Sequence, residues 1–184
     1  MAVTIFTRIL KDTYHRKFLS LLVTILLYLG FIPIISRFVR FKFLLDIFFS
    51  AVLLSAIFAV SEKKHQTIIA LALGIPMLVM IWVDKFVVTD RLLIGAQLTG
   101  AVFFGYTICR LLIFVFTESR VTHNVIYAAI IVYLLMGLFW ADLYFLLNHL
   151  QPGTLDISGV QTDNPGLVVV YFSYVTLTTL GYGD

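Results

Sequence analysis

The chain has 184 residues, of which 61% are hydrophobic and only 12% are charged. Because charged residues normally make up about a quarter of a globular chain, this composition excludes an ordinary soluble domain. The formal net charge is +3, and no extended run of basic residues occurs, so no nucleic-acid partner is expected. A modest excess of basic residues is instead typical of membrane proteins, which keep them on cytoplasmic loops.

Five apolar runs precede the C-terminal segment, at about 18–35, 43–60, 67–83, 92–116 and 125–147. At about 1.5 Å per residue, each can cross a hydrocarbon core of roughly 30 Å with some tilt or local thinning. A membrane β-barrel would show short segments of alternating polarity instead. The pattern therefore predicts an all-α integral membrane protein with five transmembrane helices.

The segment before the first run carries Phe6, Ile9 and Leu10 at helical spacing among basic residues. This pattern predicts a short interfacial helix on the cytoplasmic face. A frayed basic tail would explain the segment equally well. With the N-terminus inside, the cytoplasmic segments hold more basic residues than the outer loops, although the basic cluster at 37–42 opposes this orientation.

The composition changes after the fifth run. The stretch 148–166 is a polar loop rich in glycine, proline, asparagine and aspartate. The apolar run that follows, 167–177, is too short to span a membrane and leads directly into two glycines. It is predicted to form a re-entrant helix, which a bilayer tolerates only where protein surrounds it.

The segment 171–184 reads YFSYVTLTTLGYGD. It closely resembles the pore helix and selectivity filter of tetrameric potassium channels, and the resemblance extends over about the last third of the chain. It implies that K⁺ is held by the backbone carbonyls of Thr179, Leu180, Gly181 and Tyr182 and by the hydroxyl of Thr179. One chain supplies one filter segment, so four chains would surround a central axis.

The glycines of this segment have a physical role. A dehydrated K⁺ needs oxygen ligands in place of water, and a ring of backbone carbonyls supplies them. To direct successive carbonyls toward one axis, the backbone needs positive φ angles, which Gly181 and Gly183 accept without a Cβ clash. By the resemblance, Asp184 lies at the outer mouth, where its charge concentrates cations.

The resemblance also implies which residues support the filter. Thr178 lies next to it, and Tyr171, Phe172 and Tyr174 resemble an aromatic collar, although ordinary interfacial packing explains Phe172 equally well. Asp142, late in the fifth run, lies at the level where channel relatives often place an acid near the filter loop. A structural hydrogen-bonding role is expected for it.

Some features depart from the family pattern. Leu180 stands where many members have valine, and Val175 stands where some have a carboxylate behind the filter. Members of the family continue into an inner helix, and none follows Asp184 in this sequence. Arg91 and Arg110 lie at opposite ends of the fourth run with nothing charged between them, so conventional voltage gating is not expected.

A second intramembrane carboxylate, Asp46, lies one turn from Lys42 and is expected to pair with it. No nucleophile motif, metal signature or phosphate-binding glycine loop occurs, so neither an enzyme nor a cofactor is expected beyond the permeant K⁺.

The expected fold is thus five transmembrane helices followed by a re-entrant pore helix and filter loop, with the final inner helix missing. Residues 1–122 would form an N-terminal segment and four-helix region, and residues 123–184 a partial pore domain. The expected function is passive, K⁺-selective conduction by a tetramer in a plasma or inner membrane, with the N-terminus cytoplasmic. The alternative is a truncated, non-conducting subunit that regulates full-length channel partners.

Overall fold

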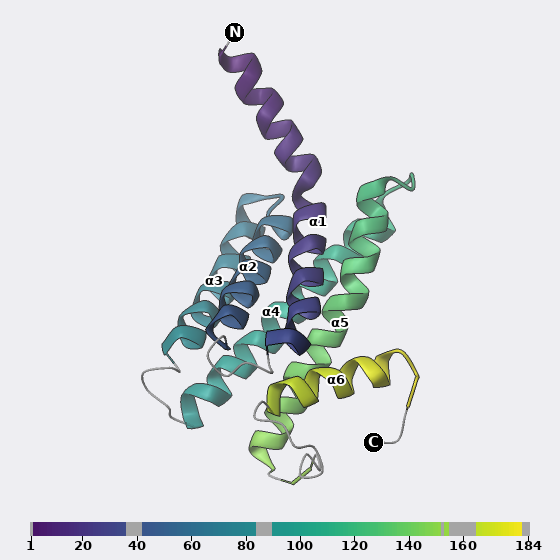
Figure 1. Ribbon diagram of the computed structural model, residues 1–184. Coiled ribbons are helices and arrows are strands. Elements are labelled where there is room, and N and C mark those ends of the chain that lie inside the picture. Colours follow the sequence, from purple (N-terminus) through teal and green to yellow (C-terminus); the bar gives the residue numbers. More distant parts are fainter. Residues whose placement is uncertain (1, 36–41, 84–89, 152, 155–164, 182–184) are drawn as a thin grey trace.

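The structure is a computed structural model that describes residues 2–35, 42–83, 90–151, 153–154 and 165–181. Every regular element in these ranges is a helix (Figure 1). The six helices are α1 (Ala2–Ile35), α2 (Lys42–Val60), α3 (Lys64–Val83), α4 (Asp90–Thr117), α5 (His123–Leu150) and α6 (Pro165–Leu177). The prediction of an all-helical fold is confirmed.

Five of these helices contain segments long and apolar enough to cross a membrane. The segments are Lys17–Ile35, Phe43–Val60, Lys64–Val83, Ile94–Thr117 and His123–Leu150. Each overlaps one of the five apolar runs of the sequence, and their ends differ by only a few residues. The protein is therefore a multi-pass membrane protein.

The N-terminal segment does not form a helix of its own. It is the first part of α1, which is helical without a break from Ala2 to Ile35 and projects beyond the bundle at its N-terminal end (Figure 1). Adding a residue to an existing helix costs far less than nucleating a new one, and the sequence before Lys17 contains neither glycine nor proline to end the first helix.

The connections alternate between the two ends of the bundle. The α2–α3 turn and the α4–α5 loop lie at the end from which the N-terminus projects, and α6 lies toward the opposite end (Figure 1). At the N-terminal end, the ammonium of Lys17 on α1 lies 3.0 Å from a carboxylate oxygen of Glu62 in the α2–α3 turn. This ion pair joins the first helix to the next helical hairpin.

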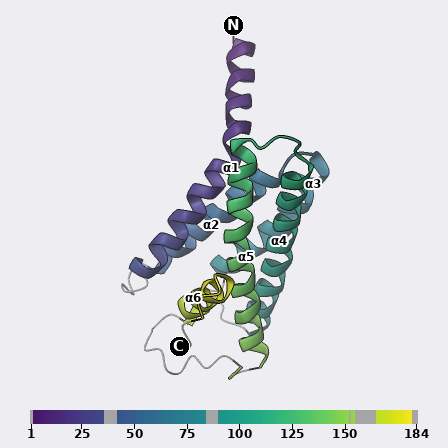
Figure 2. The same cartoon turned by 90° about the vertical axis from the view of Figure 1, so that its right-hand side faces the viewer.

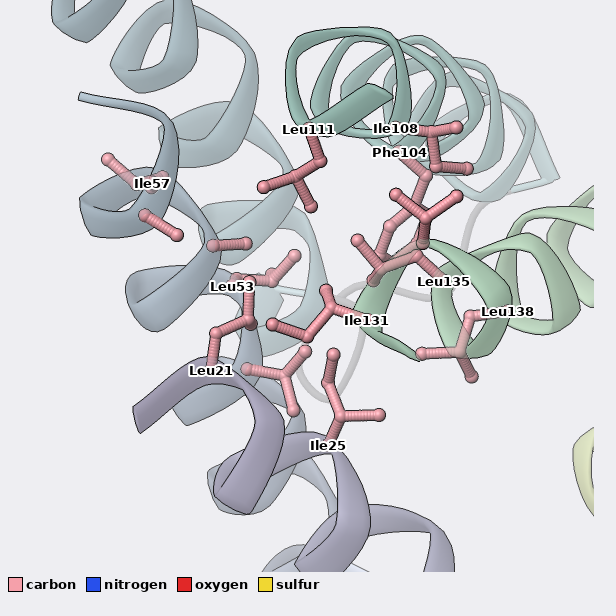
Figure 3. Close-up of a cluster of buried hydrophobic side chains, with 14 of the residues drawn as sticks. Leu21, Ile25, Leu53, Ile57, Phe104, Ile108, Leu111, Ile131, Leu135 and Leu138 are labelled. Carbon is pink, nitrogen blue, oxygen red and sulfur yellow. The ribbon is translucent and has the colours of Figure 1, made fainter. Parts of the chain in front are cut away.

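The packed core lies where α1, α2, α4 and α5 meet (Figure 3). Leu21 of α1, Leu53 of α2, Leu111 of α4 and Ile131 of α5 all contribute buried side chains to it. Lipid tails are as apolar as these residues, so close van der Waals packing stabilises the contact more than water exclusion does.

The helix α5 is central to the arrangement because it packs against α1 and α4 as well as α6. The short helix α6 crosses α5 steeply and lies within its length, not beyond its end (Figures 1 and 2). The division of the chain at residue 122 into two domains stays a prediction.

Candidate functional site

Two side-chain hydrogen bonds attach α6 to α5. The hydroxyl of Ser173 donates to the carbonyl of Gly137 at 2.6 Å, and that of Tyr174 donates to the carbonyl of Leu134, also at 2.6 Å. The missing side chain of Gly137 makes room for the Tyr174 ring, which a Cβ atom at that position would overlap. The position of α6 therefore depends on a glycine and two hydroxyls.

The C-terminal end of α6 has the geometry of a Schellman motif. The amide of Thr179 donates to the carbonyl of Thr176 at 3.0 Å, and the amide of Leu180 donates to the carbonyl of Val175 at 3.1 Å. Thr179 occupies the left-handed position of the motif with φ 58°. This backbone turn ends the helix and sets the direction of the segment expected to form the filter.

Thr178 belongs to the same turn. Its hydroxyl donates to the carbonyl of Tyr174 at 2.7 Å, and its amide donates to the same oxygen at 2.9 Å. The hydroxyl and the amide of Thr178 therefore both donate hydrogen bonds to the last turn of α6, directly before the expected filter. This position agrees with the supporting role that the resemblance implies, and the role itself stays a prediction.

The carbonyl oxygens of residues 179–181 lie at this turn and directly after it. Within the described part of the chain, no group donates a hydrogen bond to the carbonyls of Thr179, Leu180 or Gly181. Gly181 also has a positive φ of 49°, as expected from its place in the motif. These acceptors lie at the C-terminal end of a helix, where the backbone dipole is negative and favours cations.

The predicted roles of Tyr182, Gly183 and Asp184 lie outside the described residues. The resemblance gives the first a carbonyl ligand, the second a permissive backbone and the third a place at the outer mouth. All three assignments stay predictions.

The three aromatic residues of the expected collar have different environments. Tyr174 is fixed to α5, whereas the ring of Phe172 makes an edge contact with Tyr144 of α5 at a centroid distance of 5.2 Å. Tyr171 is 49% exposed. Leu180 is 56% exposed. Tyr174 and Phe172 thus contact α5 of the same chain, whereas the side chains of Tyr171 and Leu180 are largely exposed within one chain.

Asp142 faces α4 and a cavity. A Cβ atom on Gly100 would lie 3.1 and 3.3 Å from its two carboxylate oxygens, so a side chain at this position would require the carboxylate to shift by a few tenths of an ångström. Asp142 borders the cavity together with Gly166 and Leu167, which lie at the beginning of α6. Within one chain, Asp142 is therefore near the N-terminal end of the pore-helix candidate, and its predicted support of the filter stays a prediction.

The same cavity is lined by Asp46, and this relation was not expected from the sequence. Asp46 had been predicted to pair with Lys42, whose side chain lies outside the described residues. A signal was nevertheless present, since both Asp46 and Asp142 are carboxylates within apolar runs. Nothing in the sequence indicated that Asp46 and Asp142 line the same cavity.

The described residues contain no group of three or more histidine, cysteine, aspartate or glutamate side chains that could hold a metal ion. A scan against protein-family models finds no matching model, and searches of curated proteins and of solved structures find no match either. A functional proposal therefore rests on the residues and their geometry.

Proposed function

We propose that this protein is a subunit of a potassium-selective channel, in which four filter segments surround a central ion path. The observation that carries the proposal is the set of carbonyls at residues 179–181, which accept no hydrogen bond from any residue that the structure describes. They lie in the sequence TLTTLGYGD at the end of a short apolar helix. A K⁺ ion leaving water needs such oxygens to replace its hydration shell.

The place of α6 supports this proposal. Its 13 residues extend over only about 20 Å at 1.5 Å per residue, less than the hydrocarbon core. It also lies within the length of α5, at one end of the bundle (Figures 1 and 2). A short apolar helix at membrane depth fits a re-entrant pore helix that directs its negative end at the ion path.

The exposed side chains at the end of the chain support assembly. Leu180 and Tyr171 project from a segment that would face neighbouring subunits in a tetramer, and those neighbours would cover them. The partners are further copies of this chain or other subunits of such a channel. In either assembly, Tyr182 supplies a carbonyl ligand, Gly183 permits the turn that follows, and Asp184 lies at the outer mouth.

The orientation follows from the ends of the bundle. The N-terminus, the α2–α3 turn with Lys63 and Lys64, and the α4–α5 loop share one end, which we assign to the cytoplasm of a plasma or inner membrane. This assignment places α6 and the filter in the outer half of the bilayer.

Gating by the usual voltage sensor is not part of this proposal. Arg110 is the one charged residue in the spanning segment Ile94–Thr117 of α4, whereas a sensor needs several arginines at regular spacing. We also propose no catalytic activity and no cofactor other than the permeant ion.

The test is ion selectivity of the gene product, taken from its own membrane and reconstituted in lipid vesicles. The proposal predicts K⁺ uptake well above Na⁺ uptake, and a Gly181→Ala variant with that preference reduced about tenfold or more. Alanine in a left-handed conformation costs about 1–2 kcal/mol per residue, which corresponds to roughly such a factor. The matched control is Gly30→Ala, because a Cβ atom on Gly30 meets nothing within 4 Å.

Three results would contradict the proposal: equal passage of the two ions, no passage of either, or an unchanged K⁺ preference in Gly181→Ala. Loss of the K⁺ preference in Gly30→Ala as well would show that the vesicle assay responds to any added methyl group, which also contradicts a specific role of Gly181.

A further inference from the structure

A cavity of about 390 Å³ lies between the N-terminal helices and the α5–α6 pair. Its walls come from α1, α2, α4, α5 and the beginning of α6. The volume falls in the range typical of small-molecule sites, roughly 300–1,000 Å³. The proposed ion path does not account for this cavity, because the cavity borders the opposite end of α6 from the filter segment.

The cavity wall is mainly apolar, and aromatic rings from four helices contribute to it. These residues are Tyr28, Phe49, Phe104 and Phe145. The rings of Tyr28 and Phe49 lie 5.3 Å apart, and those of Phe49 and Phe104 lie 6.1 Å apart. Buried water needs polar partners, and apolar cavities stay dry or take up apolar molecules. A wall of this kind therefore favours an occupant with an apolar body over water alone.

One polar group of the wall lacks a hydrogen-bond partner. The Oδ2 atom of Asp142 is buried, and within the described part of the chain no group donates a hydrogen bond to it. At membrane depth, a buried acceptor without a donor is costly. Asp46 also lines the cavity, but it already interacts with other residues of the chain. An occupant therefore needs one hydrogen-bond donor, placed next to Asp142.

We propose that this cavity binds a small neutral molecule that has an apolar body and one hydroxyl group, such as an aromatic alcohol. The hydroxyl donates a hydrogen bond to Oδ2 of Asp142, and the apolar body packs against the aromatic walls. A hydroxyl group both donates and accepts hydrogen bonds. The same pair therefore forms, with donor and acceptor exchanged, when Oδ2 carries a proton.

Two other occupants fit this wall less well. A lipid tail fills the apolar volume but leaves Oδ2 of Asp142 without a donor. An organic ammonium ion supplies a donor, but transferring its charge from water to membrane depth costs far more free energy than transferring a hydroxyl group. A neutral alcohol meets both requirements of the wall at the lowest cost of desolvation.

The site has a structural consequence. An occupant touches the N-terminal helices on one side and Gly166, Leu167, Val169 and Val170 of α6 on the other. It would therefore connect the N-terminal helices with the helix that positions the filter segment. The inference goes beyond the proposed function, because binding can be measured on protein through which no ion passes.

The test is photoaffinity labelling of the full chain in lipid nanodiscs. The probe is benzyl alcohol with a trifluoromethyl-diazirine group on the ring, and peptide mass spectrometry locates the labelled residues. Labelling is expected in the cavity wall, and excess benzyl alcohol should suppress it. Benzyl methyl ether has a similar apolar body but no O–H group. At equal concentration in the membrane, it should compete about tenfold more weakly, a difference of about 1.4 kcal/mol.

Two variants test the residues of the site. Asp142→Leu removes the acceptor with a similar side-chain volume, so the alcohol and the ether should then compete equally. Leu167→Trp adds volume at a half-buried residue of the cavity wall and should strongly reduce labelling there. Leu98→Trp is the matched control, because Leu98 is 52% exposed on α4 and lies outside the cavity wall. Its labelling should equal that of the unmodified chain.

The proposal is overturned if no residue of the cavity wall is labelled, or if excess benzyl alcohol fails to suppress the labelling. Equal competition by benzyl methyl ether also overturns it, and is the result expected for a cavity that takes up lipid tails. Stronger competition by benzylammonium than by benzyl alcohol would show a cation site instead.

The variants can overturn the assignment of the residues in the same way. A preference for the alcohol that persists in Asp142→Leu would contradict Asp142 as the acceptor, and unchanged labelling in Leu167→Trp would contradict the location. Should Asp142→Leu fail to fold, the comparison of alcohol with ether on the unmodified chain still decides the role of the hydroxyl group, and Leu167→Trp still decides the location.

Discussion

Thr179 combines a strained backbone with a proposed ligand role. It is the one residue other than glycine with a positive φ in the described part of the chain. A left-handed conformation costs an L-residue roughly 1–2 kcal/mol, and a β-branched side chain is especially unfavourable there. Two hydrogen bonds of the turn hold Thr179 in place, and under the proposed function its hydroxyl and carbonyl are K⁺ ligands.

These two demands predict opposite effects of one substitution. Thr179→Gly should stabilise the end of α6, because glycine adopts the left-handed position without strain. The same change should weaken K⁺ binding, because it removes the hydroxyl. Hydrogen exchange at the amides of residues 179 and 180 should slow several-fold, as expected for about 1 kcal/mol of added local stability. Calorimetric K⁺ titration should show lower affinity.

Thr179→Ser is the control for this prediction, because it keeps the hydroxyl and removes only the methyl branch. It should retain K⁺ affinity close to that of the unmodified chain. Faster amide exchange in Thr179→Gly would contradict the left-handed turn, and unchanged K⁺ affinity would contradict the ligand role.

At this scale the sequence predicts Gly181 but not Thr179. The positive φ expected for Gly181 is confirmed. The expectation was possible because glycine adopts a positive φ without a Cβ clash and is therefore favoured just after the end of a helix. The left-handed Thr179 opposes its own propensity. It follows from hydrogen bonds to Val175 and Thr176, which only the three-dimensional path of the chain reveals.

At the scale of elements, the contact between α5 and α6 is the most sensitive to added volume. The Tyr174 ring lies so close to Gly137 that a Cβ atom there would overlap it. We expect Gly137→Ala to destabilise the protein by about 1–3 kcal/mol, since extra volume in a packed contact forces side chains and backbone to shift. Equilibrium unfolding in increasing SDS measures this loss.

The matched control for Gly137→Ala is Gly105→Ala. Gly105 on α4 also faces α5, but a Cβ atom there would lie 3.8 Å from the Phe139 ring, an ordinary contact distance. Its stability should change little. A Gly137→Ala protein as stable as Gly105→Ala would mean that α6 does not lie against α5 at this glycine.

A second variant separates hydrogen bonding from packing at the same contact. Tyr174→Phe keeps the ring and removes the bond to the carbonyl of Leu134. Side-chain hydrogen bonds between membrane helices average about 0.6 kcal/mol, so this variant should lose less stability than Gly137→Ala in the same SDS titration. A larger loss in Tyr174→Phe would show that the hydrogen bond contributes more than the close fit.

The elements themselves could be predicted from the sequence with small errors. Membrane thickness requires about 20 apolar residues per helix, and polar residues mark the ends, so hydropathy locates all five spans. The contact of Ser173 and Tyr174 with Gly137 could not be predicted in this way. It depends on which faces meet across a sequence separation of 36 residues, and helices surrounded by lipid are apolar on every face.

At the scale of the whole molecule, the cavity shows the same limit. The sequence marks Asp46 and Asp142 separately as carboxylates inside apolar runs, but it contains no sign that they share a cavity. That relation requires α1, α2, α4, α5 and α6 to meet in one arrangement. The long-range packing of the bundle thus determines which side chains line this cavity. The resemblance to a filter, by contrast, lies within one continuous segment of the sequence, and the role of that segment stays a prediction.

The last prediction concerns topology: the arrangement of the helix ends predicts on which side of the membrane each loop lies. Lys63 in the α2–α3 turn and Glu118 in the α4–α5 loop are exposed at the same end of the bundle, and Thr154 is exposed in the chain between α5 and α6. The single native cysteine, Cys109, is first replaced by serine. Cysteine is then introduced at one of the three positions at a time.

A maleimide that cannot cross membranes should label Thr154→Cys in intact cells. It should label Lys63→Cys and Glu118→Cys only after the membrane is made permeable, because basic residues are retained on the cytoplasmic side. Labelling of Lys63→Cys and Glu118→Cys from opposite sides would contradict the five-span bundle itself. Labelling of both from outside, with Thr154→Cys protected, would keep the bundle but invert it, which would place the filter in the inner half of the bilayer and contradict the orientation proposed for the channel.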